Sequence, residues 1–321
     1  MEEHRVRTDD GWLIHLRRFN NGKEPVLFVH GMGANSANFQ LNERYCMARL
    51  VSQKGYDSWI IELRGRGLSQ HSGQGRNDWN FEDFLHRDIR TTINFIKAKT
   101  KQPLHWVGHS MGGILGIAYA QCYKPEDLAS LVLFGTPLAF DHSQWMLKIW
   151  GTLAQVHRFL PTMDQEAWGR RMLPIMKNNR KSLKFFLRYL ANPDNIDMDT
   201  VMDIFAKMVT NESSSITLQF SDWVRSGQIR SLDKKYSYTD NLAQVQVPAL
   251  FISGVTDLMA PSRGISKHIG RLGSSKKVEQ IILSKKNGFV TDYGHGDLVM
   301  GKRSPEEVYP LVGDWFRSAG D

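Results

Sequence analysis

The sequence of 321 residues has only two cysteines and no long apolar run. Disulfide frameworks are typical of small secreted chains rich in cysteine, so Cys46 and Cys122 are expected to be free, buried thiols in a reducing compartment. A membrane-spanning helix needs roughly 20 consecutive apolar residues, and no run in this chain approaches that length. Residues 1–10 are charged and polar, unlike a secretory signal. We therefore expect a cytoplasmic protein.

Several ligand-binding motifs are also missing. The sequence contains no Walker-type phosphate loop and no His-Glu-x-x-His pair for zinc. The glycine-rich stretch at 65–75 lacks the spacing of a dinucleotide-binding turn. Asp194, Asp197 and Asp199 lack the glycine and the distal glutamate of a calcium loop. We therefore expect neither a cofactor nor a metal ion.

The formal net charge of +8 does not come from one basic motif. Lysines and arginines are spread along the chain, and no nucleic-acid-binding motif accompanies them. The densest basic region, at 158–188, is interleaved with large apolar residues. We interpret it as the solvated faces of amphipathic helices and expect no nucleic-acid partner. Peripheral contact with an anionic membrane surface is the alternative.

Short apolar runs alternate with segments of helical periodicity at both ends of the chain. This alternation predicts an α/β fold with a mainly parallel, doubly wound sheet and helices on both faces. The predicted strands are 4–8 and 12–19, which form a hairpin around Asp10-Gly11, then 25–29, 56–63, 104–107, 128–134, 249–253 and 278–283. The predicted helices are 42–53, 81–99, 114–123, 262–269 and 305–318.

Between 136 and 246 the sequence shows helical periodicity alone. Helices are predicted near 142–160, 165–177, 181–190, 199–210 and 213–230. Because a structureless loop of that length is uncommon in a compact domain, we predict a helical insertion. The chain then divides into a core of 1–137 and 244–321 and a helical cap of 138–243. Most large apolar side chains of the cap should form its own core, while a few line an apolar pocket.

The sequence contains a candidate catalytic motif, Gly108-His109-Ser110-Met111-Gly112, with the spacing Gly-x-Ser-x-Gly. It lies between the predicted strand 104–107 and the predicted helix 114–123. A sharp turn from strand to helix exposes a serine hydroxyl, and the two glycines leave room for the crossing backbone. A serine becomes an effective nucleophile when it is exposed in this way and a base takes its proton. Ser110 is therefore the candidate nucleophile.

The candidate base and acid follow the last two predicted strands. His295 comes after strand 278–283 and Asp257 after strand 249–253, and the carboxyl ends of parallel strands gather at one edge. The chain order Ser, Asp, His is that of nucleophile-elbow sheets. Asp141, which follows strand 128–134, is the alternative acid. Asp292 and Asp297 are expected to fix the histidine loop.

Other histidines are weaker candidates for the base. The His109 side chain should point away from its neighbour Ser110 and fill a nearby gap. His30 precedes a glycine turn and should order that loop by hydrogen bonding. The remaining candidates lie in surface-like contexts: His71, His142, His157 and His268.

A tetrahedral intermediate needs preorganised donors for its oxyanion. The backbone N–H of Met111, at the start of the predicted helix, is one candidate. The second is the N–H of Met32 in His30-Gly31-Met32-Gly33, where glycines let the backbone approach a substrate. The alternative for this glycine pair is a tight strand-to-helix turn without a catalytic role.

Taken together, these motifs resemble the α/β-hydrolase superfamily over nearly the whole chain. The matching residues are His30-Gly31-Met32-Gly33, Arg64-Gly65-Arg66-Gly67-Leu68-Ser69, Gly108-His109-Ser110-Met111-Gly112-Gly113, Asp257 and His295. The resemblance implies the α/β-hydrolase fold, with its helical cap between the sixth and seventh strands of the sheet.

Further stretches are similar to the acid-lipase and polyhydroxyalkanoate-synthase side of that superfamily. They are Asp10-Gly11-Trp12-Leu13-Ile14-His15-Leu16, Gly55-Tyr56-Asp57-Ser58-Trp59 and His295-Gly296-Asp297. The synthases carry a cysteine at the position of Ser110, so the serine disfavours polymerase activity. Glu62 stands where many relatives have aspartate.

We therefore expect a serine hydrolase of the esterase or lipase type that cleaves carboxylic esters through an acyl-enzyme. In this interpretation Ser110 attacks, His295 transfers the proton and Asp257 orients His295. The expected substrate is a small-molecule or lipid-like ester with an apolar acyl group. The alternatives are an acyltransferase that uses the same residues and a non-catalytic ligand receptor. The oligomeric state and the identity of the substrate are left open.

Overall fold

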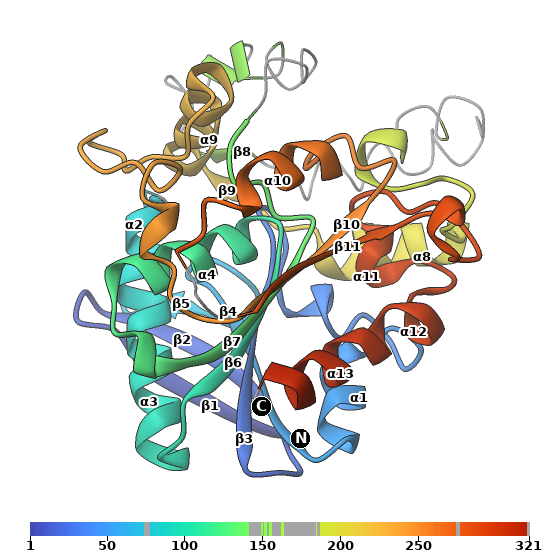
Figure 1. The fold of residues 1–321 in the computed structure, drawn as a ribbon. Coiled ribbons are helices and arrows are strands. Elements are labelled where there is room, and N and C mark those ends of the chain that lie inside the picture. Colours follow the sequence, from blue (N-terminus) through green and yellow to red (C-terminus); the bar gives the residue numbers. More distant parts are fainter. Residues whose placement is uncertain are drawn as a thin grey trace.

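The computed structural model describes residues 1–73, 78–140, 149, 151–152, 154–155, 162–163, 184, 187–273 and 277–319. Within these residues a nine-stranded sheet runs through the centre of the molecule, and a second pair of strands lies apart from it (Figure 1). The large sheet contains β1 (Glu2–Arg7), β2 (Trp12–Asn20), β3 (Glu24–Val29), β4 (Tyr56–Glu62), β5 (Gln70–His71), β6 (Leu104–His109), β7 (Leu128–Phe134), β10 (Ala249–Gly254) and β11 (Val278–Leu283). The small sheet pairs β8 (Thr162–Met163) with β9 (Glu212–Ser213).

The sheet is mainly parallel. Strands β4, β3, β6, β7, β10 and β11 lie side by side in that order and run in one direction. The hairpin β1–β2 pairs antiparallel with β4, and β5 pairs with β2. After β3 the chain forms β4 on one side of it and later returns to form β6 on its other side. The strand order therefore reverses between β3 and β6, which defines a topological switch point. Ligands of such sheets bind at this point, outside the carboxyl ends of the strands.

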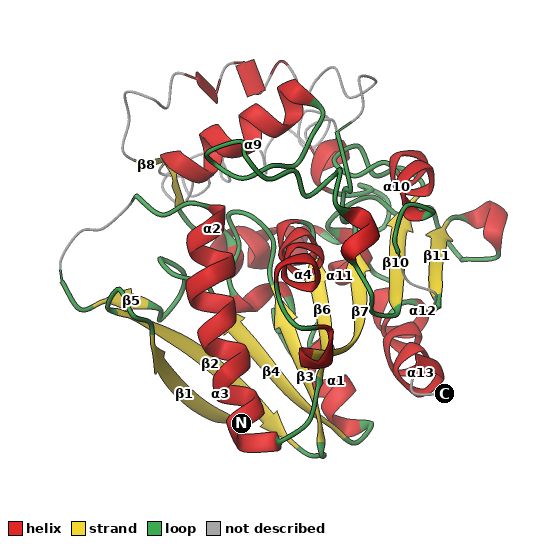
Figure 2. Cartoon of the chain, turned by 60° about the vertical axis from the view of Figure 1, so that its left-hand side comes forward, coloured by secondary structure: helices red, strands yellow, loops and turns green. Residues whose placement is uncertain are grey.

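Helices cover both faces of the sheet, which confirms the doubly wound architecture (Figure 2). Alternate residues of β3 face opposite sides. Leu27 packs in the cluster under α3 (Arg90–Thr100) and α4 (Met111–Cys122). Phe28 packs in the cluster under α1 (Met47–Gln53) and α13 (Tyr309–Ala319). The helices are α1 (Met47–Gln53), α2 (Phe81–Asp83), α3 (Arg90–Thr100), α4 (Met111–Cys122), α8 (Met198–Asp203), α9 (Ser214–Ser226), α10 (Ser262–Ile269), α11 (Asp297–Met300), α12 (Ser304–Glu307) and α13 (Tyr309–Ala319). Shorter or π-helical turns are η1 (Ser36–Asn38), η2 (Phe84–Ile89), η3 (Pro125–Asp127), η5 (Ile204–Met208), η6 (Leu242–Gln244) and η7 (Lys285–Asn287).

A few sequence predictions differ from the structure. The helix expected over 42–53 begins only at Met47, because Asn42 Oδ1 accepts the Tyr45 N–H at 3.0 Å and closes a turn instead. The helix expected over 81–99 contains the π-helical turn η2 between α2 and α3. Both cysteines are free as expected, but Cys122, at the end of α4, is exposed rather than buried.

The predicted cap is described only in part. Helices α8 and α9 and turn η5 lie within the predicted helices 199–210 and 213–230 or within a residue of their bounds, and α9 lies above the carboxyl edge of the sheet (Figure 2). Most residues of the helices predicted near 142–160, 165–177 and 181–190 lie outside the described residues. The division into core and cap therefore stays a prediction. No helix in the described ranges has the length and apolar character needed to cross a membrane.

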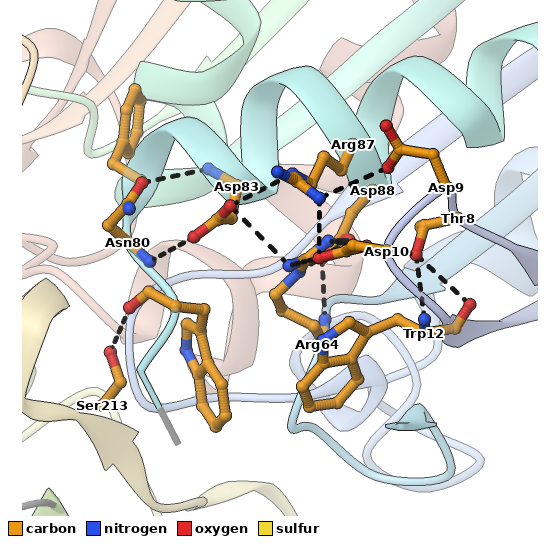
Figure 3. A network of polar contacts seen from close by, with 12 residues as sticks. Thr8, Asp9, Asp10, Trp12, Arg64, Asn80, Asp83, Arg87, Asp88 and Ser213 are labelled. Carbon is orange, nitrogen blue, oxygen red and sulfur yellow. Dashed lines mark hydrogen bonds and ion pairs between the residues drawn. The ribbon is translucent and has the colours of Figure 1, made fainter. Parts of the chain in front are cut away.

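A partly buried ion-pair network connects the hairpin β1–β2 to the helical segment 81–100 on one face (Figure 3). The guanidinium of Arg64 bonds Asp10 at 2.8 Å and Asp88 at 2.8 Å. Asp88 Oδ2 also accepts the Arg64 backbone N–H at 2.9 Å. Arg87 pairs with Asp10 at 3.0 Å and with Asp83 at 3.3 Å. The network fixes the start of the glycine-rich loop that follows β4.

Glu62, the last residue of β4, organises two loops at the carboxyl edge of the sheet. Its buried carboxylate accepts the Ser36 hydroxyl at 2.6 Å and the Leu68 N–H at 2.7 Å. His15 Nδ1 lies 3.1 Å from Oε2. Burial alone would raise the pKa of Glu62, but the His15 ring and these hydrogen bonds lower it to about 2. The ionised form is therefore the one that the fold stabilises.

Replacement of Glu62 by glutamine is expected to destabilise the protein in a pH-dependent way. The carboxyl has a pKa of about 2 in the folded state and an ordinary value of 4.5. Its stabilisation is therefore complete above that ordinary value and is lost as the pH falls toward the folded value. The pH-dependent part corresponds to about 3 kcal/mol. Urea unfolding at several pH values should show the gap between wild type and Glu62→Gln narrowing in acid.

The matched control is Glu306→Gln, which removes an exposed carboxylate paired with Arg44 at 3.1 Å. That change should alter the free energy of unfolding by less than about 1 kcal/mol at every pH. If the difference in free energy of unfolding between wild type and Glu62→Gln stayed constant with pH, the lowered pKa of Glu62 would be contradicted.

Candidate active site

Ser110 occupies the sharp turn between β6 and α4. Its backbone has φ 53° and ψ −117°, a left-handed conformation that costs a residue with a side chain roughly 1–3 kcal/mol. The turn is held because the Ser110 N–H donates to Phe134 O at 2.8 Å and its carbonyl accepts the Gly113 N–H at 2.9 Å. The Ser110 side chain is thereby presented at the carboxyl edge of the sheet.

Two glycines make this turn sterically feasible. A Cβ on Gly108 would lie 2.5 Å from the carbonyl oxygen of Gly112. A Cβ on Gly112 would lie 2.0 Å from the carbonyl oxygen of Val29 in β3. The Gly-x-Ser-x-Gly spacing is therefore required by close backbone contacts, as the sequence predicted.

His295 and Asp257 form a buried hydrogen-bonded pair. His295 Nδ1 lies 2.8 Å from Asp257 Oδ2, and both side chains are buried. The other carboxylate oxygen, Oδ1, accepts the N–H groups of Met259 and Ala260, each at 2.8 Å. These bonds fix the carboxylate, which in turn orients the imidazole with Nδ1 toward Asp257. The ring is thus held with its Nε2 atom directed away from the carboxylate.

Gly135, directly after β7, connects this pair to Ser110. A Cβ on Gly135 would lie 2.9 Å from His295 Nδ1 and 3.0 Å from Asp257 Oδ2. The preceding residue, Phe134, accepts the Ser110 N–H. Serine, histidine and aspartate therefore adjoin the same end of β7, which brings together the three side chains predicted from the sequence.

The loop of residues 31–34, called the oxyanion loop below, passes beside Ser110. A side chain on Gly31 would lie 3.4 Å from the Cβ of Ser110. In the part of the chain that is described, the Met32 N–H has no hydrogen-bond partner. Met111 is the first residue of α4, where an N–H has no partner within the helix. Both predicted donors are therefore available beside the serine.

The amides on either side of Met32 are fixed by side chains. The Gly31 N–H donates to Asn38 Oδ1 at 3.1 Å, and the Gly33 N–H donates to Glu212 Oε2 at 3.2 Å. His30 supports the same loop as expected: its Nε2 accepts the Leu63 N–H at 3.2 Å, and its Nδ1 lies 2.9 Å from Gly31 O. Burial lowers the pKa of His30 to about 4, so the ring is neutral and can both accept and donate.

His109 has a more specific place than the sequence indicated. Its ring packs against the His295 ring with centroids 4.8 Å apart, and its Nε2 lies 3.3 Å from His295 O. Its Nδ1 lies 3.1 Å from Asn38 Oδ1. Burial lowers the pKa of His109 to about 3, so this ring is a neutral support for the neighbouring imidazole.

The loop that carries His295 is tied to the predicted cap by Asp297. Its Oδ1 accepts the N–H groups of Gly294 and Asn192 at 2.9 and 2.8 Å, and its Oδ2 accepts the Asn195 amide at 2.8 Å. Asp292 accepts the Lys285 N–H at 2.9 Å. The prediction that these two aspartates fix the histidine loop is confirmed.

The other candidates fall outside the site or outside the described residues. Asp141, His142 and His157 belong to the undescribed part of the chain. His71 and His268 are partly exposed, as expected for surface histidines. In the described ranges, no group of three or more histidine, cysteine or acidic residues could hold a metal ion.

Sequence reasoning missed three residues of the site. Gly135 had a weak signal, because it follows an apolar strand directly. Asn38 and Glu212 had none, because their partners lie 7 and 179 residues away along the chain and belong to other elements.

Comparison with known proteins supports the fold. A family model described as alpha/beta hydrolase fold matches residues 24–293, and a model of a partial alpha/beta-hydrolase lipase region matches residues 1–43. A gastric triacylglycerol lipase of Mus musculus is 33% identical over 357 aligned positions, which cover 96% of this chain and 86% of that protein. One from Bos taurus is 24% identical over 353 positions, with the same coverage.

Solved structures share the fold at lower identity. A thermophilic esterase from Thermogutta terrifontis is 17% identical, with a TM-score of 0.64 over 100% of both chains. A monoacylglycerol lipase from Paleococcus ferrophilus is also 17% identical, with a TM-score of 0.61 over 99% of this chain and 100% of its own. Because the family model spans residues 24–293, on a doubly wound sheet with a serine elbow, the chain belongs to the α/β-hydrolase fold family.

Proposed function

We propose that this protein cleaves carboxylic esters through an acyl-enzyme formed on Ser110. Ester hydrolysis as the class of reaction is supported by family membership and by lipase relatives that align along 96% of the chain. The observation that carries the mechanism is the hydrogen bond of 2.8 Å between His295 Nδ1 and Asp257 Oδ2, beside the serine turn.

The reaction begins when Ser110 Oγ attacks the ester carbonyl carbon and His295 Nε2 takes the hydroxyl proton. Asp257 holds the imidazole in the required tautomer and stabilises the imidazolium that forms. The carbonyl oxygen becomes an oxyanion, which accepts the N–H groups of Met32 and Met111. Each such donor contributes about 2.7–4 kcal/mol to stabilising the transition state.

The tetrahedral intermediate then collapses. The bond from carbon to the leaving alkoxide breaks, and His295 gives its proton to that oxygen, so the alcohol departs. Water attacks the acyl group on Ser110, with His295 taking the water proton, and a second collapse releases the acid and restores the serine hydroxyl. Release of free acid without an added acceptor distinguishes this hydrolase from an acyltransferase.

We further propose a lipid-like ester with an apolar acyl group as the substrate. The relatives named as triacylglycerol lipases support this class. In the described part of the predicted cap, Trp223 belongs to the core rather than to an open pocket, because it is fully buried and packs on Phe81 and Phe220. The proposal of an apolar acyl group therefore rests on the relatives and on Met32, a partly buried apolar residue of the oxyanion loop.

Removal of the nucleophile or of the base should abolish turnover. We expect Ser110→Ala and His295→Ala to lower kcat for a nitrophenyl ester by roughly four to six orders of magnitude. A fluorophosphonate probe should label the wild type and not Ser110→Ala. The control Ser266→Ala changes an exposed serine of α10 and should behave as the wild type. If His295→Ala kept its turnover, His295 would not be the base.

Substitution of Gly135 by alanine should separate His295 from Asp257. The new Cβ would meet both side chains of the pair at 2.9–3.0 Å. We expect kcat to fall roughly a hundredfold or more, because small misplacements of catalytic groups are costly. Gly288→Ala is the matched control: its φ of 91° imposes similar backbone strain, but its Cβ would meet nothing within 4 Å. An equal loss of kcat in both variants would contradict the steric explanation.

A series of nitrophenyl esters of increasing chain length should reveal the acyl preference. Each methylene that is buried in the bound state contributes about 0.8 kcal/mol, or roughly a fourfold gain in kcat/KM. We therefore expect kcat/KM to rise from acetate toward medium-length chains. A steady decline from acetate onward would rule out an apolar acyl pocket.

A further inference from the structure

The oxyanion loop is held by a carboxylate from the predicted cap. Glu212 lies in β9, and its side chain is fully buried. Its Oε2 accepts the N–H of Gly33, the residue after Met32, at 3.2 Å. On the basis of the proposed function, we propose that Glu212 is a positioning residue, which aims the Met32 N–H at the oxyanion of the tetrahedral intermediate.

Arg66 fixes the carboxylate that performs this role. The guanidinium forms a fully buried ion pair with Glu212 Oε1 and also donates to Asn211 O. Oε1 accepts the Ser213 N–H at 3.0 Å as well, and the Trp79 indole N–H lies 3.4 Å from it. One oxygen is thus occupied by fixed donors, so the other has a defined direction toward Gly33. Charge on the acceptor strengthens that bond.

Arg66 is itself anchored through its neighbours. Arg64, two residues earlier, is held in the ion-pair network of Figure 3. Gly65 between them packs against Trp79, since a Cβ there would lie 2.3 Å from that ring. The Ser213 hydroxyl donates to Trp79 O. Figure 3 shows Ser213 beside the network. The carboxylate is therefore connected to the rigid core on both sides.

Other contacts from the same segment hold different atoms of the loop. The Thr210 N–H donates to Gly33 O at 2.9 Å, and its hydroxyl donates to Ala34 O at 3.2 Å. Asn35 Nδ2 donates to Lys207 O at 2.8 Å. In the described residues these bonds fix carbonyls or side chains, whereas Glu212 accepts the Gly33 N–H, as Asn38 accepts the Gly31 N–H on the other side of Met32. Loss of Glu212 should therefore misdirect the Met32 N–H without detaching the loop from the segment that carries Thr210.

The test must separate positioning from the stability of a buried ion pair. Loss of Glu212 alone would leave the Arg66 charge buried and unpaired, which threatens folding. Two double variants avoid this: Arg66→Met with Glu212→Gln, and Arg66→Met with Glu212→Leu. Both replace the pair by neutral side chains of similar size. Glutamine keeps an oxygen that can accept the Gly33 N–H, and leucine does not.

We expect kcat of the leucine double variant to be roughly 30- to 100-fold below that of the glutamine double variant. KM should differ by less than about threefold, because the oxyanion exists only after binding. Hydrogen exchange at the Gly33 amide should be faster in the leucine variant. Asp222→Asn breaks another cap ion pair, to Arg230 at 2.7 Å, and should change none of these quantities.

Equal kcat in the two double variants would overturn the proposal, whatever their exchange rates. A loss of kcat with unchanged exchange at Gly33 would overturn it too, because the loop would then be ordered without Glu212. If the wild type cleaves no ester and Ser110 takes no fluorophosphonate, the proposed function fails instead. The exchange rates would still show whether Glu212 orders the loop.

Discussion

Backbone N–H groups in the loops at the carboxyl edge of the sheet have no acceptor on a neighbouring strand. Where these groups are buried, water cannot serve as the acceptor either. A carboxylate can accept several such donors at once, and donors of this kind stabilise its charge. Buried carboxylates do this for successive loops of the protein: Glu62, Asp88, Glu212, Asp257 and Asp297. These hydrogen bonds fix the loops at this edge, and the geometry around Ser110 depends on them.

These carboxylates differ in how well their surroundings compensate for burial. Burial raises the pKa of Asp88 to about 6 despite its contact with Arg64, and it raises the pKa of Asp297 to about 6 despite several donors. Glu62, which is less deeply buried than these two, has a pKa lowered to about 2. Its donors include the hydroxyl of Ser36 and the ring of His15, in addition to a backbone amide. At Glu62 the combined donors outweigh the effect of burial, whereas at Asp88 and Asp297 burial is the larger effect.

Much of this arrangement follows from local sequence patterns. The strands, the hairpin around Asp10-Gly11 and the turn at Ser110 depend on residues that are neighbours in the chain, and the structure agrees with them. The meeting of Ser110, Asp257 and His295 could be predicted because parallel strands end at one edge. Asn38 and Glu212 could not be predicted, because their roles depend on how loops from separate elements pack, and Gly135 had only the weak signal of following an apolar strand. Likewise, the contact of His109 with His295 depends on a loop that a local pattern does not place.

The ion pair between Arg66 and Glu212 has a consequence for how this protein can diverge. Exposed positions in the described part of the predicted cap can change with little effect on the free energy of unfolding, since solvated side chains contribute little to it. The short segment that carries Glu212 is constrained, because replacement of this residue leaves the Arg66 guanidinium buried without its counter-charge. A change at either Arg66 or Glu212 should therefore be tolerated only when the other member of the pair changes with it.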